Sequence, residues 1–277
     1  MPRRKKTLES SENTNMKVVP IRPLEIKDDT AHLHPNLPTI TRNNGSVILA
    51  IGPTSCGKTS VINWLTLNSN AWGGKKSAFE NVYIFSPSVE CDDSCRFLRE
   101  YFECYTEYKD EYLKAILDKQ ESFPKKERPK GMIVIDDSVG NSAMKRGGTL
   151  QAFLSRFRHW NMSVIMSVQS FRALSTIARA NATNILLFNG IYNSKEFEKI
   201  EEEFDDMYKC SLKKCYNTFA PKKYDFLHLK LRENPPEMYK GFQQQINYAA
   251  YGKKDLDNDV GEKNEEMQFE MSDEDSE

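Results

Sequence analysis

The chain contains 277 residues, of which 39% are hydrophobic and 29% are charged, so a folded core is combined with long polar stretches. No apolar run approaches the roughly 18 residues of a membrane-spanning helix, and the basic start is followed by polar residues, so we expect neither a transmembrane segment nor a signal peptide. The net charge of −1 hides an asymmetry, because residues 252–277 hold 11 Asp or Glu against 3 Lys, which leaves +7 for the rest. A basic body is compatible with a nucleic-acid partner.

The two ends of the chain differ in character from its middle. Residues 1–16 are polar and include the basic run from Arg3 to Lys6, which predicts a disordered arm. A solvated tail, a nuclear-localisation signal and a DNA-contacting arm are the open interpretations of this run. Residues 17–45 are interrupted by prolines and favour an extended lead-in, whereas the acidic residues 252–277 predict a disordered tail.

The most informative stretch joins an apolar run at 47–51 to a helix expected from about Gly57 to Leu67. Residues 52–59 read GPTSCGKT, a match to the phosphate-binding motif G-x-x-x-x-G-K-[ST]. The glycines let successive backbone N–H groups point at an anion, and the helix N-terminus adds partial positive charge. The predicted nucleotide-binding residues are Gly52, Pro53, Thr54, Ser55, Cys56, Gly57, Lys58, Thr59 and Ser60. Lys58 is expected to reach the β- and γ-phosphates of ATP, and Thr59 to offer a hydroxyl to Mg²⁺.

A second apolar run, residues 131–135, ends in two acidic residues, Asp136 and Asp137. In an open parallel sheet, ligands bind beyond the carboxyl ends of the strands, so a strand here would deliver both carboxylates to the nucleotide. We therefore expect Asp136 to hold Mg²⁺ opposite Thr59, and Asp137 to orient the attacking water.

Further apolar runs of strand length alternate with helical patterns. Strands are predicted at 81–85, 161–168 and 184–188, and helices at 94–121, 149–160 and 193–216, with one more helix carrying Arg172 and Arg179. Such alternation predicts an α/β fold with a mostly parallel central sheet and helices on both faces. Residues 222–231 and 238–242 predict extra C-terminal strands, which completes a P-loop ATPase domain at 46–251.

Other residues with chemical potential are distributed along the chain. Gln169 follows the strand at 161–168 at once, so its amide can touch the γ-phosphate or the attacking water. Basic loops at Lys145–Arg146 and Lys75–Lys76 are candidates for contact with DNA. His228 is expected to be a surface residue or a hydrogen-bonded one rather than a metal ligand.

The six cysteines are expected to be free thiols in a reducing compartment. The pairs Cys91/Cys95 and Cys210/Cys215 have spacings near those of zinc ligands, so a zinc site stays open as an alternative. Cys56 lies inside the phosphate-binding motif, where it is a candidate for oxidation.

Four motifs together resemble a known family. They are GPTSCGKT, the strand MIVIDD at 132–137, the run 156–159 before the strand that ends at Gln169, and the run 177–181 before the strand NILLF. This combination resembles the genome-packaging ATPases of large DNA viruses, of the poxvirus type with virophage and Polinton-like relatives, in the FtsK/HerA group of P-loop motors. The resemblance covers about residues 46–242.

The resemblance implies a role for each matching residue. Lys58 and Thr59 would bind ATP and Mg²⁺, and Asp136 would hold the metal. Asp137 stands where many members of the wider group have a glutamate that activates water, and Gln169 matches their sensor glutamine.

Members of this group form rings and supply an arginine to the ATP of the neighbouring subunit. Arg179 and Arg158 are the candidates for this role, and an ion pair with one of the chain's many acids is the alternative.

The function implied is an ATP-driven translocase that packages double-stranded DNA into a preformed capsid. The expected partners are double-stranded DNA, viral capsid or portal-vertex proteins, and further copies of the chain in a homo-oligomeric ring. The expected location is the host-cell cytoplasm or nucleus where virus assembles, with association with the virion as a further option. Another P-loop NTPase such as a DNA helicase or a small-molecule kinase, and an ATP-dependent capsid assembly factor without translocation, are the alternatives.

Overall fold

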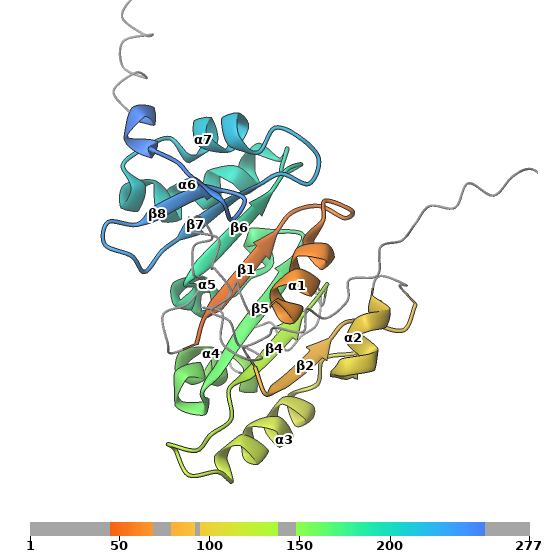
Figure 1. Ribbon diagram of the computed structural model, residues 1–277. Coiled ribbons are helices and arrows are strands. Elements are labelled where there is room, and N and C mark those ends of the chain that lie inside the picture. Colours follow the sequence, from red (N-terminus) through yellow and green to blue (C-terminus); the bar gives the residue numbers. More distant parts are fainter. Residues whose placement is uncertain (1–44, 69–78, 92–94, 138–147, 253–277) are drawn as a thin grey trace, which may run out of the picture.

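Extended segments come together in one nine-stranded sheet in the computed structural model, which describes residues 45–68, 79–91, 95–137 and 148–252 (Figure 1). The strands are β1 (Val47–Ile51), β2 (Asn81–Phe85), β3 (Glu103–Tyr105), β4 (Gly131–Ile135), β5 (Met162–Val168), β6 (Asn184–Phe188), β7 (Phe226–Lys230), β8 (Glu237–Lys240) and β9 (Gln244–Gln245). Their order in the sheet is β3-β2-β4-β5-β1-β6-β7-β8-β9. Pairing is parallel from β3 to β6 and antiparallel from β6 to β9.

Helices connect the parallel strands. The α-helices are α1 (Lys58–Leu67), α2 (Arg96–Tyr101), α3 (Asp110–Glu121), α4 (Thr149–Arg156), α5 (Thr176–Asn181), α6 (Ser194–Tyr208) and α7 (Leu212–Phe219). Short 3₁₀ turns are η4 (Phe157–Trp160), η5 (Phe171–Ala173) and η6 (Tyr248–Tyr251). None of the helices in the described part of the chain is both long and apolar enough to cross a membrane.

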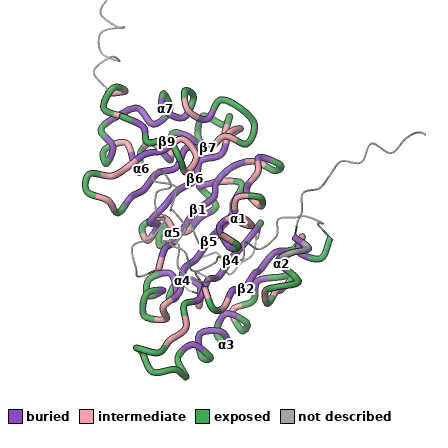
Figure 2. The backbone as a smooth tube through the Cα atoms, viewed as in Figure 1, coloured by how far each residue is buried: buried purple, intermediate pink, exposed green. Residues whose placement is uncertain are grey.

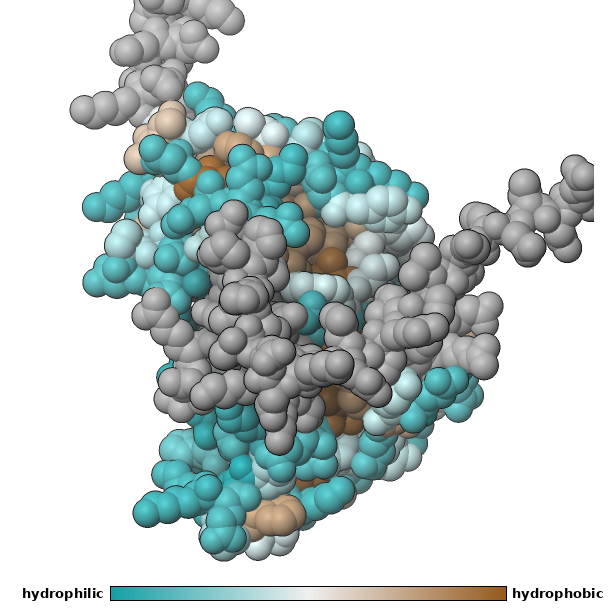
Figure 3. Space-filling model, in the orientation of Figure 1, coloured by the Kyte–Doolittle hydropathy of each residue, from teal (hydrophilic) through white to brown (hydrophobic). Residues whose placement is uncertain are grey.

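The central strands are apolar along their whole length because both faces of the sheet are covered. All five residues of β1 are fully buried, and alternate residues enter two separate cores. Val47 and Leu49 face a core that includes residues of α3 to α7, whereas Ile48 and Ala50 face a core that includes residues of α1. Figure 2 shows the buried strands between helices whose outer sides are exposed. Among the described residues that are visible in Figure 3, most are hydrophilic and apolar ones show only in small areas. The predicted α/β class is confirmed.

The antiparallel extension buries a histidine. His228 of β7 is fully buried, and its Nε2 lies 2.8 Å from Oδ1 of Asn184 on β6. Burial lowers the pKa of His228 to about 3, with a smaller contribution from the charge of Lys230. The residue is therefore hydrogen-bonded rather than at the surface, and it is neutral at physiological pH.

Two predicted helices are each divided in two. Residues 94–121 do not form one helix, because residues 103–105 pair with β2 as strand β3, where Tyr105 stacks on Phe85 with ring centroids 4.8 Å apart. Residues 193–216 break at Lys209, whose φ of 52° is left-handed, and the side chain of Ser211 then accepts a hydrogen bond at the start of α7. The segment after Gln169 contains a 3₁₀ turn before the short helix α5.

The predicted C-terminal strands are present but shorter. β7 begins at Phe226 rather than at 222, because residues 222–225 form a turn in which the Asp225 amide donates to the Lys222 oxygen at 2.9 Å. β8 ends before Gly241, whose φ is 58°. The predicted arm at 1–16, most of the lead-in at 17–45 and the acidic tail lie outside the described residues, so these domain boundaries stay predictions.

We predict that His228 contributes to acid sensitivity. Because its folded-state pKa is lowered from 6.5 to about 3, the stability that the neutral ring provides is present above pH 6.5 and is lost as the pH falls toward 3. In His228→Gln, the free energy of unfolding, measured by urea denaturation at pH 7 and pH 5, should fall less between the two pH values than in the wild type. His159→Gln, which changes an exposed histidine, is the control, and an unchanged pH dependence in His228→Gln would contradict the prediction.

Candidate active site

The phosphate-binding motif forms a tight turn between β1 and α1. The amide of Gly52 donates to the carbonyl oxygen of Val168 at the end of β5 at 3.1 Å, which fixes the start of the turn to the sheet. A Cβ on Gly52 would lie 2.7 Å from Cβ of Phe188 and 2.8 Å from Sγ of Cys56, so only glycine fits there. Gly57 has a φ of 103° and precedes the first turn of α1. The turn thus has the shape that presents backbone N–H groups to phosphate.

Lys58 is folded over its own loop. Its Nζ donates to the carbonyl oxygens of Gly52 at 2.8 Å and Pro53 at 2.7 Å, and the residue is buried. This places an ammonium group inside the curve of the loop, where phosphate oxygens can replace the carbonyl oxygens as acceptors. Burial raises the pKa of the nearby Cys56 thiol despite the opposing charge of Lys58. Cys56 is therefore not a low-pKa thiolate, which is the form that oxidises most readily.

Asp136 lies at the end of β4 between the ends of two neighbouring strands. Its amide donates to the oxygen of Phe85 at 2.8 Å, and the Ser86 hydroxyl lies 3.5 Å from its Oδ2. Burial raises the pKa of Asp136, whereas the hydroxyls of Ser167 and Ser86 and the charge of Lys58 oppose that rise. These contacts offset only part of the cost of burying the carboxylate charge, so the site is well suited to bind a cation.

Asp137 and Gln169 form a direct contact at the exposed edge of the site. Nε2 of Gln169, after β5, donates to Oδ1 of Asp137, after β4, at 2.9 Å. Both side chains are exposed, and Asp137 has a left-handed φ of 46°. The structure therefore brings together a carboxylate and an amide, 32 residues apart in sequence, where a water molecule can reach them.

The oxygen donors of the site fit Mg²⁺ better than a transition metal. The buried Asp136 carboxylate and the Thr59 hydroxyl are hard oxygen ligands. Within the described ranges, no group of three or more His, Cys, Asp or Glu residues could hold a metal ion, and that includes the two cysteine pairs. A metal here would complete its shell with phosphate oxygens and water, which is the usual arrangement for Mg²⁺.

The two arginine candidates do not join this site within the chain. Arg179 in α5 pairs with Glu203 at 3.0 Å, and its guanidinium lies 5.2 Å from the centre of the Phe171 ring. Arg158 in η4 is exposed, with its guanidinium 5.4 Å from the Phe157 ring centre. Since α5 and η4 each precede a parallel strand, they lie at the edge of the sheet opposite the turn between β1 and α1 (Figure 1). Neither arginine therefore lies beside the phosphate-binding turn of its own chain.

The sequence interpretation missed the hydroxyls beside Asp136. Ser86 directly follows β2, and Ser167 is the second-last residue of β5, so both positions at strand ends could have indicated the site. The predicted DNA-contacting residues Lys145–Arg146 and Lys75–Lys76 lie outside the described residues.

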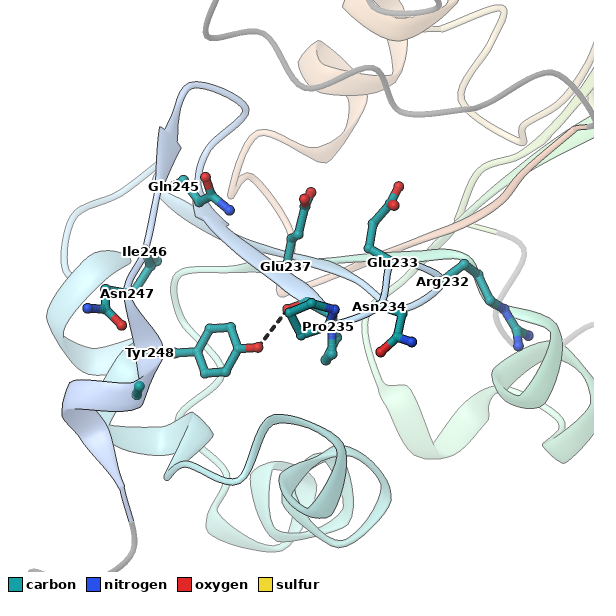
Figure 4. Close-up of a pocket in the computed structure, with 11 residues that line it drawn as sticks. Arg232, Glu233, Asn234, Pro235, Glu237, Gln245, Ile246, Asn247 and Tyr248 are labelled. Carbon is teal, nitrogen blue, oxygen red and sulfur yellow. Dashed lines mark hydrogen bonds between the residues drawn. The ribbon is translucent and has the colours of Figure 1, made fainter.

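A hollow lies beside β8, remote from this chemistry. It has a volume of about 900 Å³ and is lined by residues 232–237 and 245–249, with Tyr248 donating to the Pro236 oxygen at 2.7 Å (Figure 4). Two of its acids, Glu233 and Glu237, pair with Lys230 at 3.3 and 2.9 Å. Its charged groups thus support the β7–β8 hairpin and offer no phosphate-binding loop.

The glycine-rich turn after a central parallel strand, with carboxylates at the end of β4, defines the protein as a P-loop NTPase in fold and site. The family described as Poxvirus A32 protein matches residues 47–213, more than half of the sequence, and the chain belongs to this family. Among curated proteins, no significant match was found.

Solved structures of viral NTPases have the same fold. The genome packaging NTPase B204 from Sulfolobus turreted icosahedral virus 2, in complex with AMP, aligns with a TM-score of 0.55 and 16% identity over 74% of this chain and 100% of that chain. The DNA-packaging ATPase B204 from Sulfolobus turreted icosahedral virus aligns with a TM-score of 0.55 and 14% identity over the same shares, 74% and 100%. At these identities the similarity concerns the fold.

We predict that Asp136→Asn makes the protein more stable and abolishes metal-dependent hydrolysis. The raised pKa means that Asp136 favours folding only when protonated, so its contribution is lost as the pH rises above 3.8, and the neutral amide removes this cost at pH 7. The Tm at pH 7 should rise, whereas Mg²⁺-dependent nucleotide hydrolysis should disappear. Asp137→Asn, at an exposed carboxylate, should leave the Tm unchanged, and a lower Tm in Asp136→Asn would refute the argument.

We predict that Asp137→Asn separates nucleotide binding from hydrolysis. The amide keeps an oxygen for Gln169 and loses the charge that can accept a proton from water, so kcat should fall by about 10²–10⁴-fold. Affinity for a non-hydrolysable ATP analogue should be retained, because the P-loop is unchanged. Asp118→Asn, an exposed substitution on α3, is the matched control for kcat and affinity. Equal losses of affinity and kcat in Asp137→Asn would assign the residue to binding instead.

Proposed function

We propose that this protein is an ATP-driven translocase that packages double-stranded viral DNA into a preformed capsid. The observation that carries the proposal is the contact between Asp137 and Gln169 beside the P-loop, because a binding module has no need of a carboxylate and an amide held at the exposed end of the phosphate site. Membership of the Poxvirus A32 family gives further support. So does the shared fold of B204, which is described as a genome packaging NTPase and was solved with ATP-gammaS.

In this proposal each residue of the site has one task during hydrolysis. Lys58 exchanges the carbonyl oxygens of Gly52 and Pro53 for oxygens of the β- and γ-phosphates. Thr59 and Asp136 would hold Mg²⁺, which would neutralise charge on those phosphates. Asp137 orients the water that attacks the γ-phosphorus and accepts its proton as the bond to ADP breaks.

Gln169 links this chemistry to the rest of the molecule. Its side-chain amide donates a hydrogen bond to Asp137. The residue itself directly follows β5, and the neighbouring strand β1 carries the P-loop. A change at the γ-phosphate therefore reaches the central strands through one side chain, which is the behaviour expected of a sensor.

The motor requires further copies of the chain and DNA. A homo-oligomeric ring would let Arg158 or Arg179 approach the ATP of the neighbouring subunit, where an arginine can accelerate phosphoryl transfer by about 10³–10⁵-fold. Lys145–Arg146, with Lys75–Lys76 as the second choice, would contact the phosphates of DNA in a sequence-independent way. Capsid or portal-vertex proteins would complete the assembly in the host-cell cytoplasm or nucleus.

We predict that double-stranded DNA of any sequence stimulates steady-state ATP hydrolysis. Contact with phosphates makes the stimulation sensitive to salt, so it should fall steeply between 50 and 200 mM salt. The measurement compares phosphate release with and without DNA at both salt concentrations. Lys58→Ala should abolish hydrolysis, because the variant loses the charge that holds the β- and γ-phosphates.

The other outcomes distinguish the alternative functions. Hydrolysis that is indifferent to DNA would favour a different P-loop NTPase, and strand separation of a duplex substrate would favour a helicase. ATP binding without turnover would favour a capsid assembly factor that uses the nucleotide only as a switch.

A further inference from the structure

Two tyrosines are strongly exposed close to the P-loop. Tyr192 is 87% exposed and Tyr224 is 61% exposed, more than any other large hydrophobic side chain in the described part of the chain. Tyr192 belongs to the loop after β6, and Tyr224 to the loop before β7. Large aromatic rings in water at the edge of a ligand site are suited to contact with a partner or ligand.

Both loops touch the phosphate-binding turn itself. The Tyr224 ring packs over Gly57, because a Cβ on Gly57 would lie only 3.1 Å from Cδ1 of that ring. Gly190, in the other loop, approaches Pro53 so closely that a Cβ there would lie 2.7 Å from Cγ of Pro53. The same added atom would lie 3.8 Å from Cε2 of Tyr192. The two tyrosines therefore border the turn that would hold the phosphates.

Hydrogen bonds within the chain hold the two loops together. The amide of Asn189 donates to the oxygen of Asp225 at 2.9 Å, and its side-chain amide donates to the oxygen of Ala220 at 2.7 Å. The Tyr216 hydroxyl donates to the oxygen of Phe188 at 2.8 Å and accepts from the amide of Ile191 at 3.0 Å. A site formed from these loops is organised in advance, which lowers the cost of binding.

Tyr224 also has a strained backbone. Its φ of 74° lies in the left-handed region, which is a rare conformation for a bulky aromatic residue. In this conformation the ring packs over Gly57. Such strain is retained where surrounding contacts enforce it, and it concentrates at ligand sites.

The direction of a bound nucleotide follows from the order of the strands. Asp137 and Gln169, which mark the γ-phosphate end, follow β4 and β5 on one side of β1. The loops with Tyr192 and Tyr224 adjoin β6 and β7 on the other side of β1. A triphosphate held in the turn after β1 therefore directs its nucleoside toward the two tyrosines.

We propose that Tyr224 and Tyr192 form the site for the base of the nucleotide, which they bind by stacking on its purine ring. The proposal rests on the function proposed above and specifies how the same site recognises the nucleoside. Tyr224 is 61% exposed even with the Lys223 ammonium 5.0 Å from the centre of its ring, so the ring is accessible from the solvent side. Stacking uses the π-face that every base offers, so the site selects a nucleotide over bare phosphate rather than one purine over another.

The test compares a nucleotide with a ligand that has phosphates and no base. Isothermal titration calorimetry would measure the affinity of the full chain for AMPPNP, a non-hydrolysable ATP analogue, and for inorganic tripolyphosphate, both with Mg²⁺. Tyr224→Leu should weaken AMPPNP binding by about 5- to 100-fold, and the double variant with Tyr192→Leu by more, since stacking is lost. Affinity for tripolyphosphate should not change, and Tyr224→Phe should bind AMPPNP like the wild type.

The controls separate this inference from the function on which it rests. Tyr101→Leu removes a 56% exposed ring from α2, which adjoins β2 and β3 and not β6 and β7, and should change the affinity for neither ligand. If Tyr224→Leu lowered the affinity for both ligands equally, the inference would be overturned, and the role of Tyr224 would be to support the turn at Gly57. If the double variant bound AMPPNP like the wild type, the inference would also be overturned, and contact with a protein partner would remain as the role of the two rings. A wild-type chain that binds neither ligand would overturn the proposed function itself.

Discussion

The parallel register of the central strands is the constraint on which the site depends. Ile51 of β1 lies opposite Val168 of β5, so the P-loop and the segment that begins with Gln169 leave the sheet at the same level. One strand further, Ile135 lies opposite both Phe85 and Met166, and the next residues, Ser86, Asp136 and Ser167, therefore form a row across three strands. A slip of one residue in either pairing would turn Asp136 to the other face of the sheet.

The fold class and most of the site could be predicted because the governing signals are local. The strand VILAI is apolar at every position, as expected of a strand that is covered on both faces of the sheet. The P-loop motif follows this strand directly. The carboxylates 136 and 137 were placed correctly because a buried strand must end where its apolar run ends. The sequence interpretation also predicted Gln169 at the tip of β5, although its contact with Asp137 depends on the order of the strands, which periodicity does not encode.

The errors arose where a non-local contact overrides a local pattern. Tyr105 follows Tyr101 by four residues, which is a helical spacing, yet pairing of residues 103–105 with β2 and stacking of Tyr105 on Phe85 make this segment a strand. For His228 the sequence left a surface position and a hydrogen-bonded one open, and Asn184 on another strand provides the partner that permits its full burial. The sequence did not indicate a role for Tyr224 in the site. Its role depends on the proximity of its ring to Gly57, which lies about 170 residues earlier in the chain.

The antiparallel extension has a consequence for the site as well as for stability. Without β7, strand β6 would be an exposed edge directly beside the strand that carries the P-loop. Because β7 runs in the opposite direction, its first residue, Phe226, lies opposite Phe188, the last residue of β6. The loop that leaves β6 and the loop that enters β7 must therefore meet at the carboxyl edge of the parallel sheet, next to the phosphate-binding turn. A parallel strand in that position would have begun at the opposite edge, and neither Tyr224 nor its loop could have reached Gly57.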